Sequence, residues 1–159
     1  MGKGKIVLIA TGITVGILGL LYVNNETAPN KSNCINVYVD YGVLSKKTPD
    51  TTCVVADKKT NALTVLAKSG YVFKYIDFGK DLGKAVCTVN KLPKISCDKM
   101  DWKSYWGVFE RHGQNTLNAN SHWNMSAKGL SFIQLNPGDS IGMVYLKDGK
   151  VRYPNDNNN

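Results

Sequence analysis

The sequence predicts an α+β domain, in which a small sheet carries one short helix and two disulfides, preceded by a single N-terminal transmembrane helix. Three observations predict this architecture. An uncharged apolar segment opens the chain, the 4 cysteines all follow it, and short strand patterns surround one helical pattern. The chain has 159 residues and no internal repeat. About 120 residues remain after the apolar segment and a polar spacer, which is enough for one domain.

The N-terminal membrane anchor is expected at residues 1–23. Ile6 to Val23 carries no charge and is rich in Ile, Val, Leu and Gly. As a helix this segment is about 27 Å long, close to the roughly 30 Å hydrocarbon core of a bilayer. A cleaved secretory signal is the alternative, but such signals have a shorter apolar region and a small-x-small cleavage site, which we do not find. We therefore favour an uncleaved anchor.

Lysines predict the orientation of this anchor. Lys3 and Lys5 lie on its short N-terminal side, and basic flanks stay in the cytoplasm. The predicted localisation is the cell membrane, single-pass, with an extracellular C-terminal domain. Residues 24–33 form a predicted polar spacer, residues 34–153 the exported domain and residues 154–159 a disordered, Asn-rich tail.

The cysteines fit an exported domain. They are Cys34, Cys53, Cys87 and Cys97, and no two of them form a Cys-x-x-Cys pair. An even number of cysteines in an exported chain indicates disulfides, and four cysteines allow three connectivities. We expect Cys34–Cys53 and Cys87–Cys97, because each closes a compact local loop. A metal site is disfavoured, since zinc sites use close ligand pairs.

Two strand patterns and a helix pattern begin the domain. Ile35 to Tyr41 alternates apolar and polar side chains, apart from Tyr38, and Thr51 to Val55 resembles a second short strand. The predicted helix runs from Asn61 to Gly70. Thr60 or Asn61 can cap it, Leu63, Leu66 and Ala67 form its apolar face, and Gly70 supplies a left-handed stop. So short a helix is unstable alone in water, so it must pack on a sheet.

The rest of the domain consists of further strands and turns. Strands are expected at Tyr71–Phe78, Lys84–Val89, Ser104–Glu110 and Ser140–Tyr145. Turns are expected at Asn90–Pro93, Asn136–Asp139 and Lys147–Lys150. Several strands with one helix inserted after the second give the α+β class.

No motif of catalysis stands out. The chain has no Gly-x-Ser-x-Gly elbow, no Gly-rich phosphate loop and no His-Glu-x-x-His pair. Its aspartates mostly occupy turn-like positions, and Asp139 beside Ser140 is expected as a turn residue rather than half of a dyad. We therefore expect a protein that is not an enzyme, with no catalytic residue, no resident cofactor and no metal.

Basic residues outnumber acidic ones, 20 against 12, for a net charge of +8. The lysines are scattered and lack the aromatic interleaving of a nucleic-acid-binding stripe, so nucleic acid is not an expected partner. The charge is expected to serve solubility and a weak attraction to an anionic cell envelope.

An aromatic cassette between Tyr105 and Gly142 is the candidate binding region. Its candidate ligand-binding residues are Trp106, Phe109, Trp123, His112 and His122. Aromatic surfaces suit a flat, partly apolar ligand, and histidines on a loop can bind a metal centre as axial ligands. Burying an aromatic side chain stabilises a small domain, so a core role is favoured for any single tryptophan. Of the two tryptophans in the cassette, Trp106 is expected in the core, and Trp123 with its flanking loop is the expected ligand region.

The order of these pieces resembles a known family. The pieces are Cys34 with Val37–Gly42, Cys53, Ala62–Leu66 with Gly70 and Tyr71, Val86–Asn90 with Pro93 and Cys97, Tyr105–Gly107, Trp123 with Ser126 and Gly129, and Pro137–Gly142. Together they resemble the transcobalamin-like C-terminal domain family, and most of all its exported bacterial members. The resemblance implies a β-grasp-like sheet. In cobalamin carriers, such a domain covers one face of the corrin ring.

The predicted function is a membrane-anchored, extracellular, non-enzymatic binding module that captures a small ligand such as a corrinoid. Cobalamin would then be a ligand and not a cofactor. The alternative is a cell-envelope structural or protein-interaction (adhesion) module without a small-molecule ligand. The predicted partners are the membrane, through residues 6–23, and either the small molecule or an envelope protein.

Overall fold

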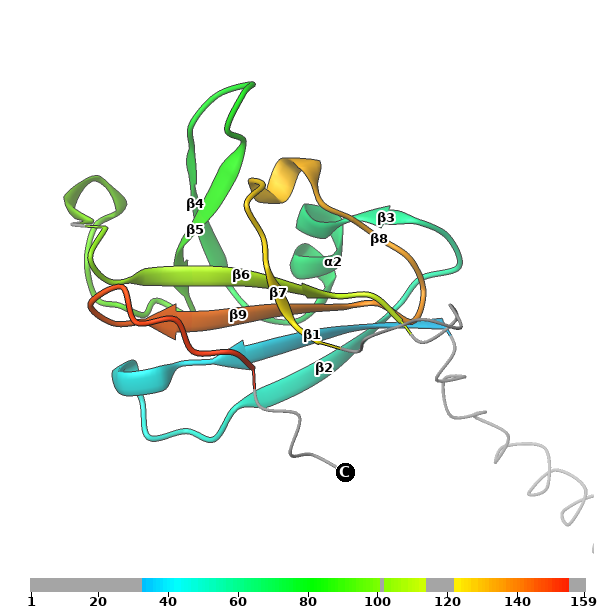
Figure 1. Ribbon diagram of the computed structural model, residues 1–159, viewed down its shortest axis with the longest axis horizontal. Helices are drawn as coiled ribbons and strands as arrows, with labels where there is room; N and C mark the ends of the chain where they lie inside the picture. Colours follow the sequence, from blue (N-terminus) through cyan, green and yellow to red (C-terminus); the bar gives the residue numbers. More distant parts are fainter. Residues whose placement is uncertain (1–32, 101, 114–121, 155–159) are drawn as a thin grey trace, which may run out of the picture. The chain divides into compact units, whose positions relative to one another are not determined.

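Five strands pair into one mixed sheet. The computed structural model describes residues 33–100, 102–113 and 122–154. The strands are β1 (Cys34–Asp40), β2 (Asp50–Val55), β6 (Tyr105–Arg111), β7 (Asn124–Met125) and β9 (Ser140–Leu146). Their order across the sheet is β2-β1-β9-β6-β7 (Figure 1). β1 and β9 run parallel, and the other neighbouring strands run antiparallel.

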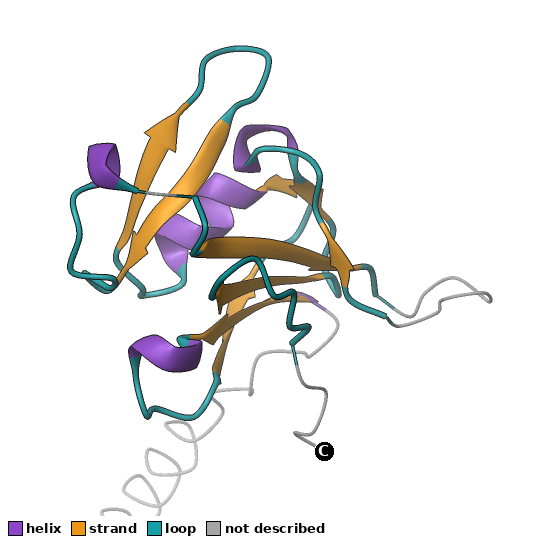
Figure 2. Cartoon of the chain, turned by 60° about the vertical axis from the view of Figure 1, so that its left-hand side comes forward, coloured by secondary structure: helices purple, strands orange, loops and turns teal. Residues whose placement is uncertain are grey.

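Smaller elements lie beside this sheet. β3 (Thr60–Asn61) pairs with β8 (Gln134–Leu135), and β4 (Phe73–Asp77) pairs with β5 (Lys84–Val89) as an antiparallel hairpin. The helix α2 (Ala62–Lys68) and three short 3-10 turns, η2 (Gly42–Leu44), η3 (Cys97–Lys99) and η4 (Leu130–Phe132), complete the described elements. α2 and the β4–β5 hairpin lie on the same side of the large sheet (Figure 2).

The start of α2 explains which face of the helix is buried. The Asn61 side chain accepts a hydrogen bond from the Leu63 amide at 2.9 Å and donates one to the Ser131 carbonyl at 2.9 Å. This double attachment turns Ala62, Val65 and Leu66 towards the sheet. The predicted face of Leu63, Leu66 and Ala67 is therefore wrong in one member, since Ala67 is exposed, whereas Leu66 is buried and the half-buried Leu63 packs against the core.

The main core lies between the sheet and α2 with β5. Alternate residues of the central strands point into it, because successive side chains of a strand face opposite sides. Its buried members include Ile35, Val37 and Val39 from β1, Ile141 and Met143 from β9, Val65 and Leu66 from α2, and Val86 and Val89 from β5.

The opposite face of the sheet is also covered. Tyr38, Phe109, Trp123, Val144 and Leu146 form a second buried cluster there. The C-terminal segment lies over it, with the Tyr153 ring edge-on to Phe109 at 5.5 Å between centroids. An ion pair between Arg152 and the buried Asp40 ties the same segment to β1.

The α+β prediction and both predicted disulfides are confirmed. Cys34 and Cys53 join β1 to β2 with Cα atoms 5.4 Å apart, and Cys87 and Cys97 join β5 to η3 at 5.6 Å. All the predicted strands agree with the structure to within a residue or two, and the largest difference is at Tyr71–Phe78, where β4 begins at Phe73.

The predicted anchor lies outside the described residues. The same holds for most of the spacer at residues 24–33 and for residues 155–159 of the tail. Within the described part of the chain, no helix has the length and apolar character needed to cross a membrane.

Candidate functional site

The predicted aromatic residues divide between the two faces of the sheet. Trp106 belongs to the main core, whereas Phe109 and Trp123 belong to the second cluster. Trp106 and Phe109 are three positions apart on β6, so strand alternation turns them to opposite sides. The fold therefore brings Phe109 and Trp123 together and separates both from Trp106.

Trp106 is packed as a core residue. Its indole Nε1 donates a hydrogen bond to the Leu92 carbonyl at 3.2 Å. The rings of Tyr41 and Tyr145 meet it edge-on, with centroids 5.7 and 5.5 Å away. The side chain is thus enclosed by aromatic neighbours with its N–H bonded, which is how a buried tryptophan is accommodated.

Trp123 closes the second face of the sheet and is 7% exposed. The Arg111 guanidinium lies 4.8 Å from the centre of its ring, and the Tyr38 ring lies 5.9 Å away between centroids. A Cβ at Gly142 would come within 3.1 Å of the indole, so the absence of a side chain there lets Trp123 lie against the strand. Trp123 and Phe109 both contribute to packing on this face.

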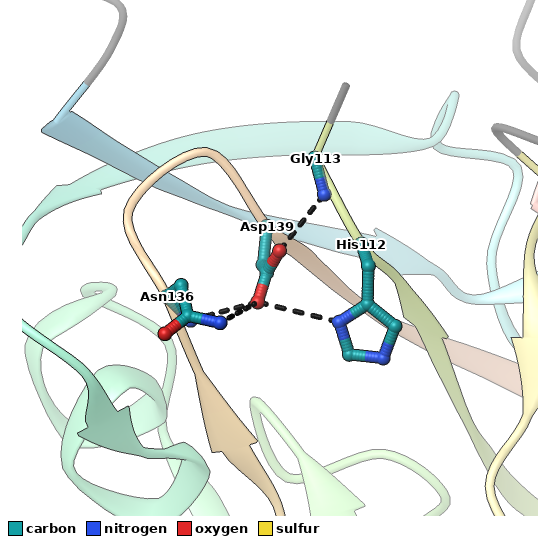
Figure 3. Close-up of polar contacts among 4 residues, drawn as sticks. All are labelled: His112, Gly113, Asn136 and Asp139. Carbon is teal, nitrogen blue, oxygen red and sulfur yellow. Dashed lines mark hydrogen bonds and ion pairs between the residues drawn. The ribbon is translucent and has the colours of Figure 1, made fainter. Parts of the chain in front are cut away.

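His112 is held by a buried carboxylate (Figure 3). Its Nδ1 lies 3.3 Å from Oδ2 of Asp139, whose residue is 3% exposed. The other carboxylate oxygen accepts a hydrogen bond from the Gly113 amide at 2.8 Å, and the Asn136 amide donates to Oδ2 at 2.7 Å. Asp139 therefore joins the end of β6 to the turn before β9.

Gly113 has a steric role in this network. A Cβ at this position would lie 2.6 Å from the Gly138 carbonyl oxygen, which no side chain tolerates without movement of the backbone. The close approach of these two backbone segments places the Gly113 amide within bonding distance of Asp139.

His112 and His122, the two predicted ligand histidines, are both exposed. The His112 side chain is 62% exposed, and among the described residues no hydrogen bond links it to a serine or cysteine. His122 is also exposed, and residues 114–121 between the two histidines lie outside the described residues. Nowhere in residues 33–100, 102–113 and 122–154 do three or more His, Cys, Asp or Glu side chains gather in a way that could hold a metal ion.

A polar hollow of about 490 Å³ lies beside His112. Its polar lining includes Lys59, Glu110, His112, Asn124 and Gln134. Of the five predicted ligand-binding residues, His112 alone lines it. The imidazole, oriented by Asp139, could offer its other nitrogen to a molecule in this hollow.

A second hollow, here named the apolar groove, shares the segment Met125–Lys128 with the first. Its volume is about 220 Å³. The buried residues Val86, Trp106 and Gly107 form its floor, and Leu82, Trp102 and residues 125–129 form its rim. Trp106 thus touches this groove from below while Phe109, Trp123 and both histidines do not line it.

Exposed apolar side chains lie in and beside the groove. Leu82, 67% exposed, Trp102, 48%, and Met125, 37%, line it, whereas Phe132, 46%, lines the polar hollow and Phe78, 43%, lies against Trp102. The rings of Phe78 and Trp102 are in contact, with centroids 5.4 Å apart. The tip of the β4–β5 hairpin also lies close to η4, since a Cβ at Gly83 would lie 2.9 Å from the Phe132 ring. Three segments distant in sequence therefore share one apolar surface.

Lysines are the charged residues of the groove. Lys84 and Lys128 line it, and its lining contains no aspartate or glutamate. Lys84 Nζ is 3.9 Å from the Asp77 carboxylate, and both side chains are well exposed, so this ion pair is weak. The groove is therefore apolar with a basic margin.

Sequence reasoning missed the groove residues Leu82 and Trp102 and the neighbouring Phe78. The available signal was Trp102, a large aromatic outside every strand pattern and next to Lys103 in a polar stretch. A tryptophan in such a stretch has no local partner that would bury it.

No protein-family model and no curated protein sequence matches this chain.

Proposed function

We propose that this chain is a non-enzymatic interaction module, held at the cell surface by its N-terminal segment, that binds a protein partner through the apolar groove. One observation carries the proposal. The exposed Leu82 and Trp102 line the groove and the exposed Phe78 contacts Trp102, whereas the tryptophans of the predicted ligand region are buried. Contiguous exposed apolar surface bordered by polar residues is typical of interaction sites.

A β-grasp-like fold forms part of this proposal. The strand order β2-β1-β9-β6-β7, with a central parallel pair and one helix on one face, supports it. An extracellular location agrees with the two disulfides, because disulfides persist in oxidising compartments.

Capture of a small molecule such as a corrinoid is the second candidate. The observation in its favour is His112, an exposed imidazole that Asp139 orients at the edge of the polar hollow. Its predicted aromatic platform has less support, because Trp106 lies on the other face from Phe109 and Trp123.

Site-specific photo-crosslinking in the native host tests the interaction module. A benzophenone amino acid in place of Trp102 is expected to give a discrete protein adduct in intact cells. The matched control carries it in place of Val55, which is 53% exposed and lies outside the groove lining. Absence of an adduct at position 102, or equal adducts at both positions, would contradict the proposal.

Titration of the full chain in nanodiscs with cobinamide separates the two candidates. The interaction module predicts no corrinoid-specific quenching of tryptophan emission after correction for absorbance. Saturable quenching would favour ligand capture. Its loss in His112→Ala would then assign the imidazole as a ligand.

A further inference from the structure

We propose that the apolar groove binds an acidic, extended peptide segment that inserts one large apolar side chain between Leu82 and Trp102. This inference rests on the proposed function as an interaction module and names the chemistry of the partner. It follows from the size of the groove, its exposed rim and its charge.

The size of the groove fits a single side chain. Its volume is about 220 Å³, below the roughly 300–1,000 Å³ of pockets that enclose a drug-sized molecule. Its floor is formed by Val86, Trp106 and Gly107, which are buried and already packed. A large aromatic or aliphatic side chain can fill such a space, as anchor residues do at the centres of protein interfaces.

The rim of the groove supplies contact area around that anchor. Trp102 is half exposed and its ring is supported from one side by Phe78. Leu82 is 67% exposed at the tip of the β4–β5 hairpin. Tryptophan is enriched among residues that dominate binding energy, and two rings already in contact lose little side-chain freedom on binding.

The margin of the groove selects an acidic partner. Lys84 and Lys128 line it without any carboxylate in the lining. No carboxylate of the described residues forms an ion pair with Lys128, and Lys84 is paired only weakly with Asp77. Carboxylates of a bound peptide would complement both lysines, and the net charge of +8 would speed their approach.

A lipid surface fits the groove less well than a peptide does. A bilayer presents a broad, nearly flat face, which would meet Leu82 and Trp102 but leave the concave floor over Trp106 unfilled. A peptide side chain reaches the floor and the rim together. The membrane is therefore the alternative that the experiment must exclude.

The test measures fluorescence anisotropy of labelled octapeptides with the full chain in zwitterionic nanodiscs. The probe has one central Trp among Asp and Glu residues. One matched peptide replaces that Trp with Ser, and a second replaces the acidic residues with Lys. The acidic Trp peptide is expected to bind at least about tenfold more tightly than either control, and to weaken as salt rises from 50 to 300 mM.

Variants locate the site. Leu82→Asp and Lys128→Glu are each expected to weaken the acidic Trp peptide by about tenfold or more, whereas Val43→Asp, at an exposed position outside the groove lining, leaves binding unchanged. Lys128→Glu alters an exposed side chain only, so loss of binding in that variant is not a loss of folding.

The outcomes separate this inference from the proposed function. Equal binding of the three peptides overturns the acidic-peptide inference, while a protein adduct at position 102 in cells would keep the interaction module. Without that adduct, both proposals fail. A third outcome is that the chain binds phosphatidylglycerol vesicles, that Leu82→Asp abolishes this binding, and that the three peptides bind equally. This outcome would assign the surface to the membrane and would also overturn the inference.

Discussion

Asp139 shows how one buried side chain fixes the ends of two strands. Its carboxylate accepts hydrogen bonds from the amides of Gly113 and Asn136 and holds the His112 ring. The sequence predicted a turn residue, which is correct for its position. Its partners at Gly113 and His112 precede it by more than 25 residues and reach it only because β6 pairs with β9. No local pattern contains that information.

Asp139→Asn is expected to destabilise the domain by about 1–3 kcal/mol, the usual cost of leaving a buried polar group without its partner. The amide keeps the shape of the carboxylate, but its NH₂ group would face a backbone donor. Urea unfolding measures the loss. The control is Asp57→Asn at an exposed position, and equal stability of the two variants would contradict the prediction.

Two tyrosines at the β4–β5 hairpin, Tyr71 and Tyr75, are expected to make the domain less stable at high pH. Burial raises the pKa of Tyr75 to about 12, and burial is also the main cause that raises the pKa of Tyr71 to about 12. An unfolded tyrosine loses its proton near pH 10. From about pH 10 to 12 the unfolded chain therefore binds fewer protons than the folded one, so stability falls as pH rises through this window.

Tyr75→Phe removes one of these groups and is expected to make stability depend less steeply on pH between 10 and 12. Denaturant unfolding at a series of pH values measures the slope. Ile76→Val on the same strand removes no titrating group, so its slope should equal that of the parent chain. A Tyr75→Phe slope that also equals the parent slope would refute the argument.

Strands and helices with their own sequence pattern were predictable, whereas the short strands that exist only by pairing with another segment were not. β1, β2, β5, β6 and β9 carry alternating or β-rich sequences and lie close to their predicted bounds. The two-residue strands β3, β7 and β8 exist because a partner lies beside them. The helix was predicted with Leu63 and Leu66 on its packed face, but the sequence pattern did not indicate that Ala62 and Val65 are buried or that Asn61 bonds Ser131, 70 residues away.

Each disulfide is expected to stabilise its pair of elements by about 3 kcal/mol in the chain-entropy model, since the bridged residues are 19 and 10 positions apart. Replacing Cys34 and Cys53 together, or Cys87 and Cys97 together, should lower the guanidinium midpoint. Reduction of the parent chain should lower it further than either double substitution. A midpoint that neither substitution changes would show that the loops are ordered without the bridges.

On the scale of the whole molecule, the C-terminal segment acts as a cover for the second face of the sheet. Tyr153 packs on Phe109, and Arg152 pairs with Asp40. Removing residues 151–159 is therefore expected to lower the melting temperature and to increase binding of a dye specific for exposed apolar surface. The control removes only 155–159, which contains no apolar side chain. Equal dye binding by the two truncated chains would contradict the covering role.

The apolar groove also belongs to the whole molecule. It is built from the hairpin tip, from Trp102 and from residues 125–129, and none of these segments has an apolar pattern of its own. The aromatic cassette attracted the functional prediction because it concentrates tryptophans in sequence. In space its tryptophans are core residues, and the exposed tryptophan lies just outside it. The part of the sequence with the most closely spaced tryptophans therefore indicated core residues and not the exposed surface.

The position of β9 has a consequence for the order of folding. This strand ends at Leu146, near the C-terminus, yet it lies between β1 and β6. The β1–β2 hairpin can close early and be sealed by its disulfide, but one edge of β1 stays open until the last strand is available. Joining strands about 100 residues apart carries a high loop-closure cost, which slows folding. During that interval β1 is an apolar strand edge exposed to other chains, so the nascent protein is most prone to aggregation just before its final strand is inserted.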